Sequence, residues 1–244
     1  DSMVENLDSW TKSAEIMNNV SYVPGEIAFP ALKSGTEFLK TQAGYIGVRD
    51  FTYMNHVIEL LQLDPSANLK KMSKGMKQKT AIVAALMGEK DILVLDEPTT
   101  GLDPLMREAF LDLIREEKQK GHTVFMSSHI FEEIEAVCDR VAMIKDGHII
   151  DTISLYDLRH PYIKNFIVEF AQERDKKRFL DDPRFQSESR NALGCTMQCD
   201  ISQLDDLFHT LKCMEVTNFR EIRRSLQEQF MSTYKEGLAR NGNK

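Results

Sequence analysis

The stretch ILVLDEP, residues 92–98, consists of four apolar residues followed by two acidic residues and a proline. The apolar run is typical of a buried strand, and open α/β sheets place their chemistry at the carboxyl ends of such strands. At that end Asp96 can hold a magnesium ion through water, and Glu97 can orient or deprotonate an attacking water. An acidic pair is also common at a solvated strand end, so the neighbouring sequence has to decide between the two interpretations.

Strand and helix patterns alternate around this stretch, which predicts an α/β fold with a largely parallel sheet and covering helices. The clearest helix follows Asp103, because Pro104 suits a first turn and Gly121 ends the pattern. The strand patterns are residues 20–23, 92–95, 123–126, 141–144 and 148–154, and the other helical patterns are residues 51–63, 74–87 and 130–138.

The pattern changes near His160 and Pro161, where we place a domain boundary. Residues 1–160 form the first predicted domain, and residues 161–244 form a small α+β appendage. In the appendage, strand-like stretches at 163–170 and 195–201 mix with helical ones at 203–212 and 219–234. Its titratable residues form no cluster of the kind that a catalytic site needs. We therefore expect it to serve dimer or partner contacts.

Composition excludes several classes of protein. The net charge of -7 argues against a nucleic-acid-binding domain, which is usually basic. The longest apolar run, residues 81–87, is too short to span a bilayer, and the N-terminal sequence lacks the features of a secretion signal. We therefore expect a cytoplasmic protein with reduced thiols. Its four cysteines, Cys138, Cys195, Cys199 and Cys213, have no spacing typical of a metal site.

Two more motifs follow the acidic pair in a fixed order. GLDP occupies residues 101–104, and SSH at 127–129 follows another apolar strand. Together they resemble the ATP-binding-cassette (ABC) family, with a Walker B strand at 92–97, a D-loop at 101–104 and a switch histidine at His129. The resemblance implies a P-loop NTPase-type fold, present in part, with ATP and Mg²⁺ as cofactors.

Upstream, MSKGMKQK at residues 72–79 resembles the family signature, usually Leu-Ser-Gly-Gly-Gln, which contacts the nucleotide held by the opposite subunit. Lys74 and Met76 depart from that pattern, whereas Ser73 and Gly75 match it. Ser73 is expected to cap a helix whose free N–H groups favour a phosphate. The lysines around it either attract phosphate or form a solvated face. The variant is similar to exporter-type cassettes.

Two family motifs are altered or absent. YVPGE at residues 22–26 matches the position of the Q-loop, but Gly25 stands where glutamine is usual, and whether Glu26 replaces that glutamine is open. No G-x-x-x-x-G-K-S/T loop occurs; Lys79 and Thr80 imitate its end only superficially, since Gln78 precedes them within the signature helix. The resemblance covers roughly residues 7–158, and we expect the phosphate-binding part of the cassette to lie before Asp1.

The resemblance implies an ATP-binding and ATP-hydrolysing subunit of an ABC transporter that couples hydrolysis to export by a membrane permease. Its expected partners are that permease and a second ABC ATPase subunit, identical or different, with no nucleic acid. It would lie in the cytoplasm, peripherally on the inner face of the cell membrane, and without the loop it would be inactive alone. The implied site residues are Glu97 and His129 for catalysis, Ser73, Gly75, Asp96 and Asp103 for the nucleotide, and Asp96 for magnesium through water.

Two other functions stay open. A nucleic-acid- or ribosome-associated ABC ATPase shares this type of ATPase domain, but it tends to carry coiled-coil arms or tandem cassettes, and this chain has neither. A regulatory, non-hydrolysing cassette is favoured by the missing loop and opposed by Glu97. The transported substrate is not encoded here, because in these transporters the permease selects it.

Overall fold

In a computed structural model of the chain, the structure describes residues 2–223 and 225–232. The chain divides into two compact units, residues 1–137 and 138–244. The boundary expected at residues 160–161 falls inside the second unit, because strands β6 (Arg140–Lys145) and β7 (His148–Ser154) pair with each other. No helix in the described residues is long and apolar enough to cross a membrane.

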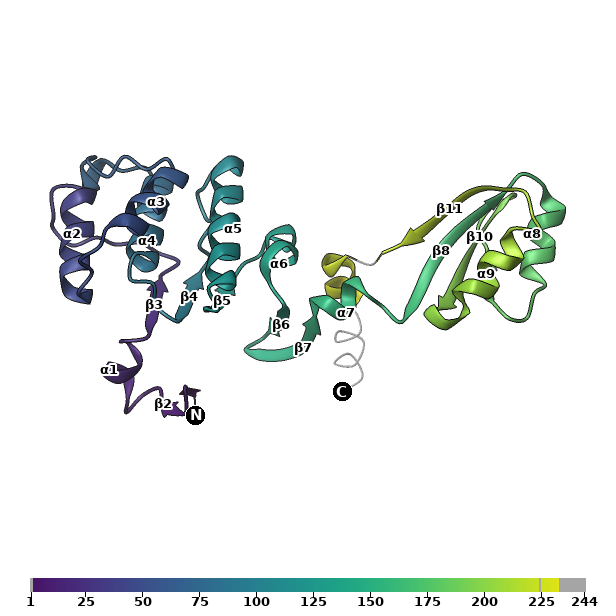
Figure 1. The fold of residues 1–244 in the computed structure, drawn as a ribbon, viewed down its shortest axis with the longest axis horizontal. Helices are drawn as coiled ribbons and strands as arrows, with labels where there is room; N and C mark the ends of the chain where they lie inside the picture. Colours follow the sequence, from purple (N-terminus) through teal and green to yellow (C-terminus); the bar gives the residue numbers. More distant parts are fainter. Residues whose placement is uncertain (1, 224, 233–244) are drawn as a thin grey trace. The chain divides into compact units, whose positions relative to one another are not determined.

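The first unit is built on a three-stranded parallel sheet in the order β3-β4-β5 (Figure 1). The strands are β3 (Val20–Val23), β4 (Ile92–Asp96) and β5 (Thr123–Ser127). Leu95 is aligned with Val23 on one side and with Met126 on the other, and Asp96 is aligned with Ser127. The acidic end of β4 therefore lies beside the hydroxyl end of β5.

One face of this sheet is covered by helices. Helix α4 packs against β3, and α5 packs against β5. On that face Val23, Leu93 and Leu95 are buried. On the opposite face, Val94 is aligned with Tyr22 and with Phe125, and the latter two are 52% and 70% exposed. The middle strand, apolar from Ile92 to Leu95, thus has one covered face and one open face within the described residues.

The helices of this unit largely match the sequence patterns. They are α1 (Ser13–Ile16), α2 (Gly35–Ile46), α3 (Thr52–Leu60), α4 (Lys74–Leu86), α5 (Pro104–Gln119) and α6 (Phe131–Val137), with a 3-10 turn at Leu69–Lys71 and a short pair of strands, β1 (Met3–Val4) and β2 (Leu7–Asp8). Only α1 and α2 lack a counterpart among the predicted helices. In α5, the Asp103 side chain accepts a hydrogen bond from the Met106 amide, and Pro104 opens the first turn, as expected for a capped helix.

A buried carboxylate joins α3, α5 and the start of β5. Glu117 is fully buried and accepts a hydrogen bond from the Tyr53 hydroxyl. Lys120 Nζ lies 2.9 Å from Glu117 Oε1, and His122 Nδ1 lies 2.7 Å from Oε2. Burial raises the pKa of the Glu117 carboxyl, but its bonds to Tyr53, His122 and Lys120 outweigh burial and hold the pKa below its ordinary 4.5.

Acid is expected to remove the stability that Glu117 contributes. A carboxyl whose pKa is lower in the folded chain stabilises it above the ordinary pKa, and this contribution disappears as the pH falls through the folded-state pKa. From about pH 5 downward, the free energy of unfolding should fall less steeply in Glu117→Gln than in the unmutated chain. Urea unfolding followed by circular dichroism measures this slope, with Glu108→Gln on the exposed side of α5 as the control. Equal slopes in all three proteins would contradict the prediction.

The second unit contains the β6–β7 hairpin, helix α7 (Leu155–Arg159) and a four-stranded antiparallel sheet. Along the chain the sheet region reads strand, helix, strand, strand, helix, strand, and its order β11-β8-β10-β9 is that of a ferredoxin-like fold. Its elements are β8 (Ile163–Phe170), α8 (Glu173–Leu180), β9 (Gln186–Ser189), β10 (Gly194–Asp200), a 3-10 turn at Ile201–Gln203, α9 (Leu204–Leu211) and β11 (Val216–Ile222).

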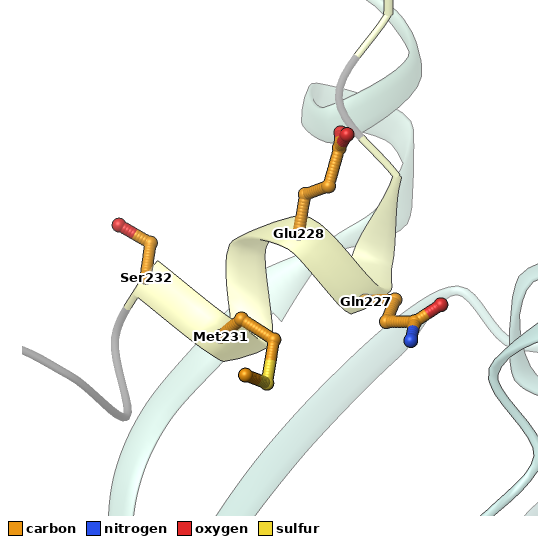
Figure 2. Close-up of a pocket in the computed structure, with 4 residues that line it drawn as sticks. All are labelled: Gln227, Glu228, Met231 and Ser232. Carbon is orange, nitrogen blue, oxygen red and sulfur yellow. The ribbon is translucent and has the colours of Figure 1, made fainter.

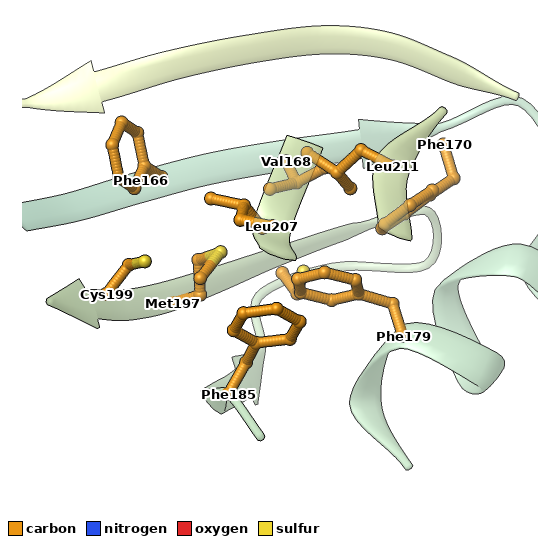
Figure 3. Close-up of a cluster of buried hydrophobic side chains, with 10 residues drawn as sticks. Phe166, Val168, Phe170, Phe179, Phe185, Met197, Cys199, Leu207 and Leu211 are labelled. Atoms are coloured by element: carbon orange, nitrogen blue, oxygen red, sulfur yellow. The ribbon is translucent and has the colours of Figure 1, made fainter. Parts of the chain in front are cut away.

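The core of this unit lies between the sheet and its two helices. Figure 3 shows Phe166, Val168 and Phe170 of β8 facing Phe179 of α8 and Leu207 of α9. The α+β character expected of the appendage is confirmed. The helical pattern expected from residue 219 is wrong for 219–222, because Phe219 pairs with Val168 and packs against this core as part of β11.

A pocket in the second unit is lined by Gln227, Glu228, Met231 and Ser232 (Figure 2). These residues belong to a helical segment that follows β11. None of the predicted site residues lines this pocket.

Candidate functional site

Asp96, Glu97 and Ser127 meet at the carboxyl edge of the parallel sheet. Asp96 ends β4 and Ser127 ends β5, which brings their side chains together. The Ser127 hydroxyl donates to Asp96 Oδ1 at 2.6 Å, and the Glu97 amide donates to Ser127 Oγ at 2.9 Å. Ser127 therefore fixes the orientation of the acidic pair. The other Asp96 oxygen, Oδ2, takes no part in the bond to Ser127.

Glu97 and His129 form a close pair. The Nδ1 atom of His129 lies 2.7 Å from Glu97 Oε2, although the two residues come from different loops. The His129 side chain is 72% exposed, so the pair opens to solvent. Glu97 has a φ of 46°, which is rare outside glycine and is held only where the surroundings determine it. The structure thus brings together the two residues predicted to be catalytic, while their chemical roles stay a prediction.

Gly25 lies directly against Asp96. A Cβ atom at Gly25 would be 2.9 Å from Asp96 Oδ2, closer than such atoms normally approach. Glycine at this position therefore allows the loop after β3 to pass beside the carboxylate. Glu26, the neighbouring carboxylate, is exposed to solvent.

Ser73 caps α4, as the signature pattern predicts. Its Oγ accepts a hydrogen bond from the Met76 amide at 3.2 Å, and the residue is exposed. Gly75 in the first turn lies against the loop that leads to Asp103: a Cβ there would be only 2.7 Å from the Gly101 carbonyl oxygen. The loops containing Ser73 and Asp103 are therefore packed together, and Gly75 is the residue that permits this contact.

Asp103 has a structural role that is visible in its contacts. Its Oδ1 atom accepts from the Met106 amide at 3.1 Å and so caps α5. The residue is nevertheless exposed. Asp103 can therefore offer its second oxygen to a ligand while Oδ1 keeps the cap.

The residues at the sheet edge fit a magnesium ion that is shared with a phosphate. Magnesium in proteins prefers hard oxygen ligands and is commonly held by one or two carboxylates together with substrate phosphates. Asp96 offers an exposed carboxylate for this purpose. No group of three or more acidic, histidine or cysteine side chains within the described residues could hold a metal alone. Asp96 is thus one ligand position that such an ion could use together with phosphate oxygens.

The sequence patterns do not reveal four residues that support this edge. Ser127 and Ser128 stand out only as part of a motif, and no motif includes Thr99 or Glu133. Thr99 and Glu133 are buried and hydrogen-bonded to each other at 2.8 Å. A signal was present in α6, because Glu133 stands four residues before the buried Val137 and therefore on the same inward face.

Comparisons with known proteins give a family model and several similar proteins. A family model described as "AAA domain, putative AbiEii toxin, Type IV TA system" matches residues 57–135, a range that includes all six predicted site residues. The chain is 49% identical to the ABC transporter ATP-binding protein NatA of Bacillus subtilis over 78 residues, 32% of each chain. It is 34% identical to the bacitracin transport ATP-binding protein BcrA of Bacillus licheniformis over 148 residues, 59% of this chain and 48% of BcrA.

A solved structure supports the same fold. The ATP-binding subunit of an ABC transporter aligns with a TM-score of 0.56 and 28% identity, covering 64% of this chain and 68% of that one. The first curated relatives extend well beyond the matched region, since the chain spans 32% to 49% of their lengths. The curated relatives and the solved structure are both described as ATP-binding proteins of ABC transporters or of a transport system.

Proposed function

We propose that this chain, which belongs to the ABC family of ATP-binding proteins, contributes the water-activating residues and the signature loop of an ATP-hydrolysing transporter subunit. The observation that carries this proposal is the Glu97–His129 pair beside Asp96 at the carboxyl edge of the sheet. In a doubly wound α/β fold this edge is where a ligand binds. The domain assignment is part of the proposal: residues 1–160 carry the cassette functions and residues 161–244 are accessory.

In this proposal, Glu97 acts on the attacking water. Its carboxylate is part-exposed and is held from one side by His129 and through its backbone by Ser127. It can accept a proton from a water aligned with a bound γ-phosphate, while His129 keeps the carboxylate in position. A magnesium ion bound at Asp96 would neutralise negative charge on the phosphates. Asp103 lies on the neighbouring loop, where its free oxygen can meet the nucleotide or a facing subunit.

The signature loop supports a role across a subunit interface. Ser73 and Gly75 stand at an exposed helix N-terminus, where free amide groups and the helix dipole favour a phosphate. In the proposed dimer, that phosphate belongs to ATP held by a second ABC ATPase subunit. ATP can then drive closure because it contacts both subunits only in the closed state.

The proposed assembly includes a membrane permease, with the chain on the cytoplasmic face. Relatives named for fluoroquinolone export and Nod factor export support export as the direction, and BcrA, named for bacitracin transport, supports transport in general. The permease would select the substrate. The net charge of -7 supports a protein partner over nucleic acid.

Hydrolysis also needs a phosphate-binding loop, and no such motif occurs in the 244 residues. The open face of the β3-β4-β5 sheet supports a place for a further segment, because the middle of a parallel sheet is normally covered on both sides. The apolar row on this open face of the sheet consists of Tyr22, Val94 and Phe125.

We expect the chain alone to show no ATP hydrolysis and a fusion with a phosphate-loop segment from an ABC relative to hydrolyse ATP at least about tenfold above background. Catalytic side chains act only on a phosphate that is already bound. Phosphate release measures the rate, and a fusion whose loop lysine is replaced by alanine serves as the control. Hydrolysis by the unfused chain would contradict the requirement for the loop, and an inactive fusion that binds ATP would favour the regulatory cassette.

A further inference from the structure

Glu133 in α6 is a buried carboxylate that touches two loops of the proposed site. It is 4% exposed. Its Oε2 atom accepts from the Thr99 hydroxyl at 2.8 Å and from the Ser128 hydroxyl at 3.2 Å. Thr99 belongs to the loop after β4, and Ser128 belongs to the loop after β5. One oxygen atom therefore joins the two segments that carry Glu97 and His129.

Stability alone does not explain a carboxylate at this position. The other oxygen, Oε1, is buried and has no hydrogen-bonding partner among the described residues. A buried carboxyl oxygen without a partner destabilises a fold, and an apolar side chain of similar size would avoid that cost. Buried polar groups of this kind are often retained where geometry matters.

The two hydroxyl partners are close in sequence to the catalytic pair. Thr99 lies two residues after Glu97, and Ser128 directly precedes His129. Ser128 Oγ also accepts from the Ile130 amide at 3.1 Å, which fixes the turn that leads into α6. Glu97 itself has a positive φ, a conformation that persists only when neighbouring contacts hold it.

We propose that Glu133 is a positioning residue that sets the distance between Glu97 and His129 by holding Thr99 and Ser128 on one carboxylate oxygen. The two hydrogen bonds from Thr99 and Ser128 to Glu133 form what we call the clamp. The kinetic consequence of this inference rests on the proposed ATPase function, but the clamp itself is a property of the fold. Misplacing a catalytic group by about 1 Å can lower a rate about 100-fold. Glu133 thus acts on the reaction through the loops and makes no contact with ATP.

The first test compares three variants in the active fusion with a phosphate loop. Glu133→Leu removes the acceptor, and we expect kcat to fall about 10- to 100-fold while KM for ATP is unchanged. Glu133→Gln keeps an amide oxygen that both hydroxyls can reach, so it should retain kcat within about threefold. Glu132→Gln is the matched control, because Glu132 is the adjacent carboxylate and is exposed. Equal kcat values for Glu133→Leu and Glu132→Gln would overturn the proposal.

The second test removes the partners instead of the carboxylate. Thr99→Val with Ser128→Ala should reproduce the loss of kcat, and adding Glu133→Leu should lower it no further if all three act as one unit. An additional loss as large as that of Glu133→Leu alone would show that Glu133 acts elsewhere. This double variant also carries the test if Glu133→Leu does not fold.

The third test needs no hydrolysis and uses the 244-residue chain. Hydrogen exchange should accelerate at residues 97–101 and 127–130 in the double variant and stay unchanged in α5. Unchanged exchange in both loops, or equal acceleration throughout the first unit, would overturn the clamp. Failure of the ATPase function would appear separately, as turnover that does not depend on Glu97.

Discussion

In a fusion that supplies the phosphate-binding loop, Glu97→Gln is expected to bind ATP normally and to hydrolyse it about 10²- to 10⁴-fold more slowly. The amide can still hydrogen-bond to water and can still offer its oxygen to His129, which lies 2.7 Å from the Glu97 carboxylate. It is a very poor base, however, and cannot take a proton from the attacking water. The substitution therefore separates binding from chemistry.

Three measurements test this expectation. Titration with a fluorescent ATP analogue gives affinity, phosphate release gives turnover, and size-exclusion chromatography with ATP and magnesium reports the closed dimer that a stalled enzyme should form. Glu108→Gln is the control, since Glu108 is an exposed carboxylate on α5 outside the site. If Glu97→Gln turned ATP over at the unmutated rate, Glu97 would have no part in the mechanism and the proposed function would fail with it.

The parts of the fold that could be predicted from sequence are those with strong local signals. The run at 92–96 and the capped pattern from Asp103 each determine their own element, and both appear where expected. Parallel strands separated by helices must share one carboxyl edge, so the closeness of Glu97 and His129 also follows from the order of motifs. Ser73 at a helix N-terminus needs only a local capping preference.

Other features depend on contacts that are distant in sequence. Helix α2 begins at Gly35 and also contains Gly44, both poor helix formers, yet Phe38, Leu39 and Ala43 are buried and hold it in place. Phe219 suits a helical pattern, but its pairing with Val168 decides that it is in a strand.

The hydrogen bonds that hold the site residues in place could not be predicted for the same reason. The bonds from Thr99 and Ser128 to Glu133 cross between loops and a helix, and the bond from Ser127 to Asp96 crosses between strands. Hydroxyl and carboxylate side chains follow no periodic pattern in the sequence from which such a partner could be predicted. Only the inward position of Glu133 on α6 distinguishes it from its exposed neighbour Glu132.

The second largest effect is expected from Ser73→Arg, which should reduce turnover at least about 100-fold while each subunit still binds ATP. Ser73 is exposed, so the larger side chain does not disturb the core, and the lost cap costs only about 1 kcal/mol. The arginine instead fills the space at the start of α4 where a phosphate from the facing subunit would lie. Ser73→Ala is the control for loss of the cap without added bulk.

A mixed dimer gives the decisive measurement, because the proposed site uses the signature loop of one subunit and the phosphate loop of the other. Pairing a Ser73→Arg subunit with one whose phosphate-loop lysine is replaced by alanine places both defects at the same nucleotide and leaves the second site intact. We expect this pair to recover hydrolysis that neither variant shows alone. If Ser73→Arg weakened ATP binding by a single subunit as much as it lowered turnover, or if the mixed pair stayed inactive although it assembled, Ser73 would not act across the dimer. The exposed position of Ser73 at the N-terminus of α4 would then be only a helix cap.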